Sequence, residues 1–177
     1  MRRPAGPVLR ARRSQDAKRS QDNVELRDVT ADNRDAVIAL ELAPGQEDLV
    51  SSNAYSLAQA RRDPDSHPRA VYAGTRIVGF LMYEVIRRRN KRNEASIYRF
   101  MIDRKHQGRG YGRAALRRAL DEIRAIPQVT RISISYMPEN PVTKRFYASL
   151  GFVEVGLDED GEMIAEFDIR SVSGSQS

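Results

Sequence analysis

Three glycines on alternate positions, Gly108, Gly110 and Gly112, are the first residues whose spacing suggests a chemical use. Glycine has no Cβ, so the backbone here can turn tightly, expose successive N–H groups and meet a ligand closely. The residues that follow, 113–126, place apolar side chains at helical spacing and predict a helix that begins at the glycines. The positive end of its dipole would point at the turn. The pattern therefore predicts a binding site for an anionic ligand.

Two common glycine-rich phosphate motifs do not fit this turn. A dinucleotide-binding fold uses G-x-G-x-x-G and a P-loop uses G-x-x-x-x-G-K-[ST], and neither spacing is present. Residues 107–112 read Q-G-R-G-Y-G and follow an apolar stretch, 100–102. This resembles the acetyl-CoA-binding motif of the GNAT N-acetyltransferase superfamily, whose pattern is Arg/Gln-x-x-Gly-x-Gly/Ala. Alone, the hexapeptide would also suit a structural turn.

A second stretch supports the same resemblance. Residues 140–152 read N-P-V-T-K-R-F-Y-A-S-L-G-F and are similar to the N-x-x-A-x-x-x-Y-x-x-x-G-F segment of GNAT enzymes. Thr143 stands where alanine is usual, a departure that touches packing only. With both motifs, the resemblance covers about residues 24–169.

The resemblance implies where acetyl-CoA binds. Its pyrophosphate would lie at the N–H groups of the glycine turn, and its pantetheine arm along residues 100–102, held by their main chain. Asn140 offers a donor and an acceptor to the same arm, although it also suits a turn before Pro141. The implied acetyl-CoA-binding residues are Phe100, Met101, Ile102, Gln107, Gly108, Arg109, Gly110, Tyr111, Gly112, Arg113, Asn140 and Tyr147.

Acetyl transfer to an amine requires two proton movements. A primary amine is neutral at pH 7 only on the order of one part in a thousand, so a base must accept its proton, and the thiolate of CoA must be protonated as it leaves. Tyr147 matches the family's tyrosine and is the candidate acid, with a core aromatic as the alternative. Because the chain has no cysteine to carry an acyl group, we expect the amine to attack the thioester directly.

The base is less well defined. Some family members carry an acid at the strand position of Tyr98, and that carboxylate is absent here. Glu84 lies near the end of an apolar strand and, if the strand is regular, shares a face with Phe80 and Met82. It is the candidate catalytic base, and a solvent-exposed residue is an equal alternative.

The acceptor amine is indicated by resemblance alone. Residues 47–60, with the segments 99–103 and 107–112, resemble the Blt-type spermine/spermidine acetyltransferases within the superfamily. Acidic side chains that could line a path for such a polycation through charge-assisted contacts are Glu41, Glu47, Asp48 and Glu84. Each also suits an ordinary solvated surface. An aminoglycoside-type antibiotic and a protein amine are alternative acceptors.

Composition narrows the remaining classes. At 177 residues and 40% hydrophobic, the chain can bury the core of one domain. It has no cysteine and two histidines, so we expect no metal site. No apolar run approaches the roughly 20 residues that span a bilayer, and we therefore expect a soluble, cytoplasmic enzyme without a membrane partner.

The net charge of +6 belongs to the first 20 residues, and the rest of the chain is neutral. This basic segment has little apolar content and is expected to be a disordered tail. The folded domain is therefore not expected to bind nucleic acid. A CoA-binding sensor whose basic tail contacts nucleic acid is the alternative that is not an enzyme.

Periodicity and turn residues predict the fold. The expected segments are a strand at 24–28, helices from Thr30 to about Pro44 and at 47–62, a loop at 64–68, a hairpin of 69–73 and 76–86, a turn at 87–93, a strand at 95–103, a helix at 110–126, a strand at 131–136, a helix from Pro141 closed by Gly151, and a hairpin of 152–155 and 163–169. The order β-α-α-β-β-β-α-β-α-β-β predicts an α/β mixed sheet with helices on both faces, similar to the GNAT fold. We expect the domain at 23–170, between a tail at 1–22 and a flexible end at 171–177. Since family members often dimerise, the resemblance also implies a homodimer.

Overall fold

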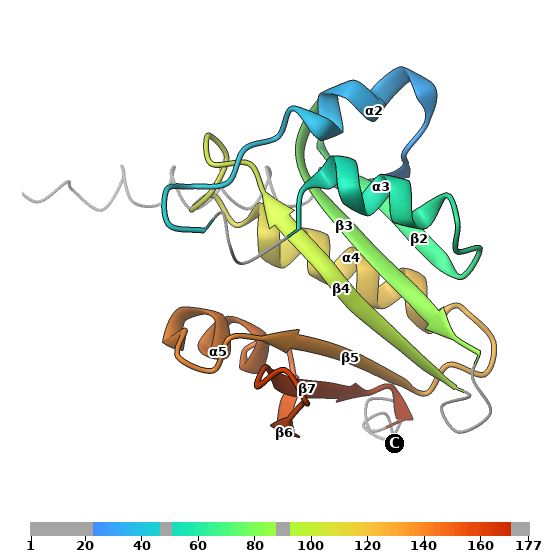
Figure 1. Ribbon diagram of the computed structural model, residues 1–177, viewed down its shortest axis with the longest axis vertical. Helices are drawn as coiled ribbons and strands as arrows, with labels where there is room; N and C mark the ends of the chain where they lie inside the picture. The colour runs from blue at the N-terminus through green and yellow to red at the C-terminus, as the bar shows by residue number, and fades with distance from the viewer. Residues whose placement is uncertain (1–22, 47–50, 88–92, 171–177) are drawn as a thin grey trace, which may run out of the picture.

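The computed structural model describes residues 23–46, 51–87 and 93–170 (Figure 1). Their elements are β1 (Val24–Asp28), α2 (Ala31–Ile38), α3 (Asn53–Ala60), β2 (Ser66–Ala73), β3 (Arg76–Ile86), β4 (Glu94–Ile102), α4 (Tyr111–Arg124), β5 (Arg131–Tyr136), α5 (Pro141–Ala148), β6 (Val153–Leu157) and β7 (Met163–Asp168). The predicted order of strands and helices is confirmed. The segments predicted as tails, 1–22 and 171–177, lie outside the described residues.

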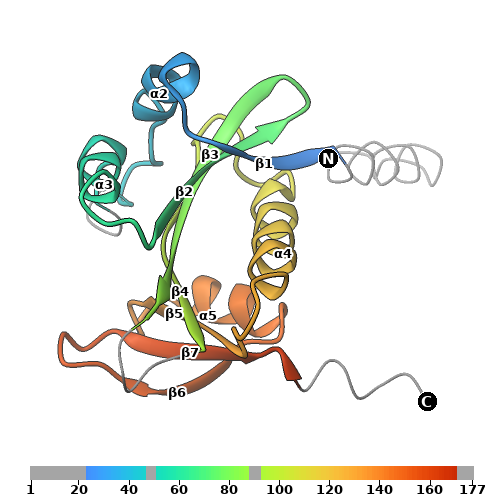
Figure 2. The ribbon, with the colours of Figure 1, turned by 90° about the vertical axis from the view of Figure 1, so that its right-hand side faces the viewer.

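The strands form one sheet in the order β1-β2-β3-β4-β5-β7-β6. β4 and β5 run parallel, whereas every other pair of neighbours is antiparallel. Figure 2 shows α2 and α3 on one face of the sheet and α4 on the other. The α/β class, the mixed sheet and the helices on both faces are thereby confirmed. Within the described residues, no helix is both long and apolar enough to cross a bilayer.

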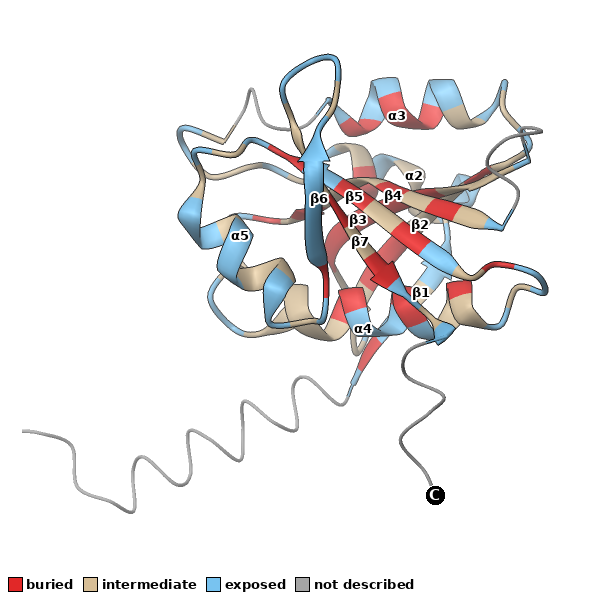
Figure 3. Cartoon of the chain, turned by 90° about the horizontal axis from the view of Figure 1, so that it is seen from below, coloured by how far each residue is buried: buried red, intermediate tan, exposed pale blue. Residues whose placement is uncertain are grey.

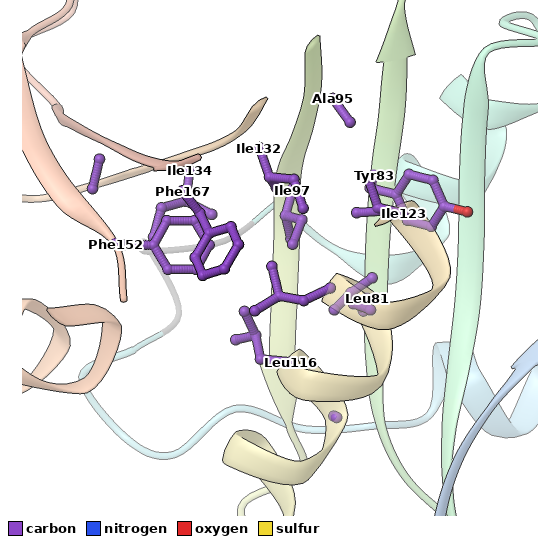
Figure 4. Close-up of a cluster of buried hydrophobic side chains, with 14 of the residues drawn as sticks. Leu81, Tyr83, Ala95, Ile97, Leu116, Ile123, Ile132, Ile134, Phe152 and Phe167 are labelled. Carbon is purple, nitrogen blue, oxygen red and sulfur yellow. The ribbon is translucent and has the colours of Figure 1, made fainter. Parts of the chain in front are cut away.

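Each face of the sheet has its own apolar core. Along β3, Phe80 and Met82 pack on the side of α2 and α3, whereas Leu81 and Tyr83 pack on the side of α4. Figure 4 shows Leu81 and Tyr83 within the α4 cluster. This is the alternation expected for a strand covered on both faces. A side chain on β3 or β4 therefore belongs to one face or the other, which matters for the site.

The helix α2 is shorter than the sequence predicts. It was expected to reach about Pro44 but ends at Ile38. The reason is a tertiary contact of Glu41: its N–H donates to Asp103 Oδ2 at 3.1 Å, and its C=O accepts from the N–H of Arg104 at 2.8 Å. The main chain of this segment bonds to the loop after β4 instead of continuing the helix.

The helix α3 is also shorter than its predicted range of 47–62. It begins at Asn53, because Ser52 is its N-cap and accepts a hydrogen bond from the N–H of Tyr55 at 3.2 Å. It ends at Ala60. Residues 47–50, predicted as its first turn, lie outside the described residues.

Two strand boundaries also differ from expectation. β2 begins at Ser66, so Pro68, predicted in a loop, lies within the strand. β1 pairs with β2 only from Arg69 onward, so Pro68 has a neighbouring strand on one side only, where a residue without an N–H is tolerated. β6 continues to Leu157 through a bulge at Val155. Most of the predicted turn at 87–93 lies outside the described residues.

The edge strand β6 is exposed along its whole length (Figure 3). Val153, Val155 and Leu157 are 67%, 55% and 60% exposed. The homodimer that the family resemblance implies remains a prediction, and this edge is an apolar surface that a partner could cover.

Candidate active site

β4 and β5 pair only over the first four residues of each strand. The parallel register runs from Glu94 with Arg131 to Ile97 with Ile134, whereas β4 continues beside β3 to its end. Figure 1 shows the two strands diverging beyond the paired residues. We call residues 98–102 the open segment of β4, because β5 does not pair with them.

A β-bulge begins the open segment. Met82 of β3 pairs with Arg99 and Tyr83 pairs with Ile97, which leaves Tyr98 as the extra residue of β4. Tyr98 packs against the core under α2 and α3. Arg99 lies two residues before Met101 of the same core, and therefore shares its face. The bulge thus turns two consecutive side chains onto one face where the strands part.

Hydrogen-bond alternation decides which main-chain groups of the open segment are available. The N–H of Asp103 donates to the C=O of Val78 at 2.9 Å. In an antiparallel pair, the main chain of Met101 then also faces β3, and the main chains of Phe100 and Ile102 face away from it. The C=O of Ile102 accepts from the side chain of Gln107 at 3.0 Å. Phe100 therefore presents its N–H and C=O to the side that β5 has left, Ile102 presents its N–H, and Met101 presents neither.

The glycine turn leads from the open segment into α4. Gly108 and Gly110 have φ values of +73° and +83°, in the left-handed region that favours glycine, and Gly110 is the N-cap of α4. The first helical bond runs from the N–H of Ala114 to the C=O of Gly110 at 3.2 Å. The N–H groups of residues 111–113 consequently have no partner within the helix and point out of its first turn. These N–H groups lie where the spacing predicts an anion site.

Gly112 brings the start of α4 against both β4 and α5. A Cβ on Gly112 would lie 3.6 Å from atoms of Phe100 and Ile102 and 3.8 Å from Phe146. Phe100 stacks on Phe146 with ring centroids 6.5 Å apart. The two sequence motifs, far apart in the chain, therefore meet at the open segment, and the missing Cβ leaves room between them.

Polar side chains of the turn hold its shape. Gln107 Nε2 donates to Gln46 Oε1 at 2.9 Å as well as to the main chain of β4. Arg113 donates to Ser149 Oγ at 2.7 Å, next to the end of α5, while Arg109 is exposed. Asp103 was not singled out in the sequence. It is buried, and its Oδ1 accepts from the N–H of Lys105 at 2.8 Å. The sequence could have pointed to Asp103, because this carboxylate lies directly between an apolar strand and the glycine turn.

Asn140 and Tyr147 both belong to α5. Asn140 is its N-cap, and its Oδ1 accepts from the N–H groups of Val142 and Thr143 at 3.2 and 3.1 Å, so its NH₂ group is left to donate. The ring of Tyr147 lies 5.5 Å from that of Tyr136, centroid to centroid. Burial, and to a smaller extent the neighbouring Tyr136, raises the pKa of Tyr147 to about 12. The phenol therefore keeps its proton at neutral pH, as an acid must.

The structure places Glu84 and Tyr147 on opposite faces of the sheet. Glu84 shares the face of Phe80 and Met82, and pairs with Ser96 of β4 just before the open segment. It lines a cavity of about 300 Å³ together with Asp63, Asp65, Val85, Ile86 and Arg87. Tyr147 lines a cavity of about 100 Å³ between α5 and the strands β5 to β7. The structure therefore does not bring the two candidates together.

The predicted substrate-binding acids do not form one group. Glu41 binds Arg104 at 2.7 Å, beyond the C-terminal end of β4, whereas Glu84 pairs with Ser96 near its N-terminal end. From Ser96 to the end of the strand, β4 advances about 20 Å at roughly 3.3 Å per residue. Glu47 and Asp48 lie outside the described residues.

A chain of hydrogen bonds on the α2 and α3 face connects β4 with the larger cavity. The hydroxyl oxygens of Tyr98 and Ser66 are 2.7 Å apart, and Ser66 Oγ donates to Asp63 Oδ2 at 2.9 Å. Ser66 is 8% exposed. Asp63 was not singled out in the sequence, because a periodic pattern does not reveal the bulge that turns Tyr98 onto this face.

Arg99 carries a cation without an acidic partner on the same face. Its NH1 group donates to the C=O of Tyr98 at 2.8 Å, and its guanidinium carbon lies 5.2 Å from the centre of the Tyr98 ring. Its buried Nε has no hydrogen-bond partner. Among the described residues, no carboxylate forms an ion pair with it. Arg99 therefore contributes to this face a positive charge that no carboxylate of the described residues pairs with.

The described residues thus combine a parallel strand pair that opens, a glycine-capped helix beside the opening and a tyrosine on the next helix. The chain belongs to the acetyltransferase (GNAT) family, whose model matches residues 23–152. It is an acetyl-CoA-dependent N-acetyltransferase, which sets aside the sensor without activity.

Individual relatives show the same kinship. The chain is 29% identical over 146 residues to the spermine/spermidine N(1)-acetyltransferase of Bacillus subtilis (strain 168), covering 80% of this chain and 96% of that protein. Its fold is similar to that of the spermidine N-acetyltransferase from Vibrio cholerae in complex with CoA and spermine, with a TM-score of 0.66 and 20% identity over 82% of this chain and 94% of that one. It is also similar in fold to the aminoglycoside acetyltransferase AAC(6′)-Ib in complex with coenzyme A, with a TM-score of 0.72 and 16% identity over 87% of this chain and 99% of that one.

Proposed function

We propose that this enzyme acetylates a primary amine of a polyamine such as spermidine or spermine. The observation that carries the proposal is the similarity to a spermine/spermidine acetyltransferase over 96% of that protein's length. The cavity at the end of β3 supports it, because the described residues that line it include three carboxylates and one guanidinium, which together carry a net negative charge. A polycation is attracted to such a surface. Glu84 is the member of the predicted acidic set that lies there.

For the donor substrate, we propose that the N–H groups of residues 111–113 and the dipole of α4 hold the pyrophosphate of acetyl-CoA. The main chain of Phe100, the N–H of Ile102 and the NH₂ group of Asn140 are placed to bond to the amides of the pantetheine arm. The space left by the missing Cβ of Gly112 fits an extended arm passing between α4, β4 and α5.

For the chemistry, we propose direct attack of the neutral amine on the carbonyl carbon of the thioester. The C–N bond forms, the C–S bond breaks, and the leaving thiolate takes the proton of Tyr147. The nitrogen of the adduct gives up one proton to solvent as the amide forms, and solvent returns a proton to Tyr147. The raised pKa of Tyr147 supports this role, since the phenol is fully protonated at neutral pH and has a proton to give.

An amine that also carries a carboxylate is a second candidate acceptor, and Arg99 favours it. An unpaired guanidinium beside the expected reaction point disfavours a nearby ammonium and attracts a carboxylate, with which it can form two charge-assisted hydrogen bonds. The carboxylate of free lysine or of a peptide would pair with the guanidinium of Arg99.

A substrate panel separates these acceptors. We expect thiol release from acetyl-CoA with spermidine or spermine at a kcat/KM at least about tenfold above that with an aminoglycoside or a peptide amine. Cadaverine and lysine form a matched pair that differs by one carboxylate. A preference for lysine that disappears in Arg99→Gln would replace the polyamine by the second candidate. Turnover of another amine with silence on every polyamine would also contradict the proposal.

A further inference from the structure

We infer that Tyr98, Ser66 and Asp63 form the route by which the acceptor amine loses its proton, an inference that rests on the proposed acetyl transfer to an amine. The chain has no carboxylate on β4 at the point where the strands part. Tyr98 stands there instead, and its side chain reaches across β3 to a serine and, through it, to a carboxylate. Tyr98 itself carries no carboxylate, and in this proposal Asp63, connected to it through Ser66, acts as the base.

The contacts form a continuous path. The distances are 2.7 Å between Tyr98 and Ser66 and 2.9 Å between Ser66 and Asp63. Each hydroxyl can accept one hydrogen bond while it donates another, so a proton can enter at Tyr98 as a different proton leaves to Asp63. The second oxygen of Asp63 accepts from the N–H of Asp65 at 3.0 Å, which fixes the orientation of the carboxylate.

The path starts from a residue of the open segment and ends at the larger cavity, and its first hydroxyl lies across β3, beside Ser66 of β2. Tyr98 is the bulge residue at the start of the open segment, on the face opposite α4 and Tyr147. Asp63 lines the cavity of about 300 Å³. Burial raises the pKa of Tyr98, so Tyr98 is a poor final acceptor of the proton and a suitable intermediate. A proton taken up at the bulge therefore ends on a carboxylate that can release it into the cavity.

The proposed step balances in atoms and charge. Before the attack, the ammonium ion loses one proton, and the electron pair of the broken N–H bond stays on nitrogen and then attacks the thioester carbon. The proton passes through water to Tyr98 Oη, while the proton of Tyr98 passes to Ser66 Oγ. The proton of Ser66 passes to Asp63 Oδ2, which becomes neutral and later releases it. Both hydroxyl groups end as they began.

Charged groups from each neighbouring element act on this path. Glu84 of β3 and Arg99 of β4 influence Tyr98 in opposite directions: Glu84 raises its pKa and Arg99 lowers it. Asp65 and Arg87 line the same cavity as Asp63. Asp65 Oδ1 forms an ion pair with Arg87 Nε at 2.8 Å. Because Asp65 is paired and lies outside the hydrogen-bonded chain, it offers a matched control in the same cavity.

The test compares Asp63→Asn with Asp65→Asn on primary amines of decreasing pKa. Asparagine can still accept the hydrogen bond from the N–H of Asp65, and its NH₂ group can donate to Ser66 Oγ with the direction of that bond reversed, but it cannot take the proton. We expect Asp63→Asn to lower kcat/KM for the amine about 10²-fold at pH 7, and the loss to shrink as the amine pKa falls, because a neutral amine needs no base before attack. Ser66→Ala and Tyr98→Phe should show the same dependence. Asp65→Asn should keep the dependence of the wild-type enzyme, and KM for acetyl-CoA should stay unchanged in Asp63→Asn.

The outcomes distinguish the route from the function. Wild-type rates in Asp63→Asn, or a loss that is equal for every amine and at every pH, would overturn the route while acetyl transfer stands. A loss in Asp65→Asn with the same dependence on amine pKa would also overturn it. If the wild-type enzyme acetylates no amine, the proposed function and the route fall together.

Discussion

Tyr147→Phe is expected to lower kcat by about 10²- to 10⁴-fold and to leave the affinity for acetyl-CoA nearly unchanged. The variant keeps the ring that packs against Tyr136 and Phe152. None of the hydrogen bonds among the described residues uses the Tyr147 hydroxyl, so its loss leaves no protein group unpaired. Thiol release gives kcat, and calorimetry gives the affinity. An unchanged kcat would remove Tyr147 as the acid.

The pH dependence of this acid follows from its pKa. As the proposed acid, Tyr147 would act in its protonated form, so we expect its contribution to be present below its folded pKa and to be lost as the pH rises through about 12. Activity should therefore show no descending limb from Tyr147 below about pH 11. Tyr136→Phe is the control, because it removes a neighbouring hydroxyl that donates to Glu154 at 2.8 Å and leaves the acid in place.

Gly79→Ala is expected to destabilise the fold by about 1–3 kcal/mol or more. A Cβ at this position of β3 would lie 2.5 Å from the C=O of Met101 and 2.7 Å from Cδ1 of Ile102. The closer atom is main chain and cannot rotate away, so β4 itself must shift. The same shift would displace the open segment and weaken acetyl-CoA binding. Urea denaturation measures the first effect, and wild-type stability would contradict the prediction.

Gly112→Ala is the matched control for a folding defect. Its Cβ would meet neighbours only at ordinary contact distances of 3.6 Å or more, and alanine in place of glycine favours a helix by about 0.5–1 kcal/mol. Its stability should equal or exceed that of the wild type. Its acetyl-CoA affinity should fall, because the added methyl group occupies the space between α4, β4 and α5. The pair separates loss of fold from loss of binding.

Local patterns were sufficient to predict much of this fold. The alternation of Phe80, Leu81, Met82 and Tyr83 between two cores follows from strand geometry alone, and the helix after the glycines follows from its apolar spacing. The end of α2 was predicted too late, because the main chain of Glu41 takes partners from a loop more than sixty residues away in sequence. The residues around Glu41 contain no local pattern that predicts such a contact.

The site was predictable to the same degree. Motifs located the glycine turn and Tyr147, since these residue types are set by backbone geometry and by chemistry. The motifs do not predict that the main chain of Met101 faces β3, because its direction depends on the register between β4 and β3. They also could not reveal the connection from Tyr98 to Asp63, which requires an extra residue in β4 and a side chain that crosses a neighbouring strand.

The placement of Tyr147 on one face of the sheet and Glu84 on the other has a kinetic consequence. Acetyl-CoA and the amine would enter from opposite faces of the sheet and meet at the thioester carbonyl carbon. Neither substrate would then block the entry of the other. A ternary complex can then assemble in either order, and initial-rate plots at several fixed amine concentrations should intersect rather than run parallel. Without an amine, labelled CoA should not exchange into acetyl-CoA, since no residue stores the acetyl group between two half-reactions.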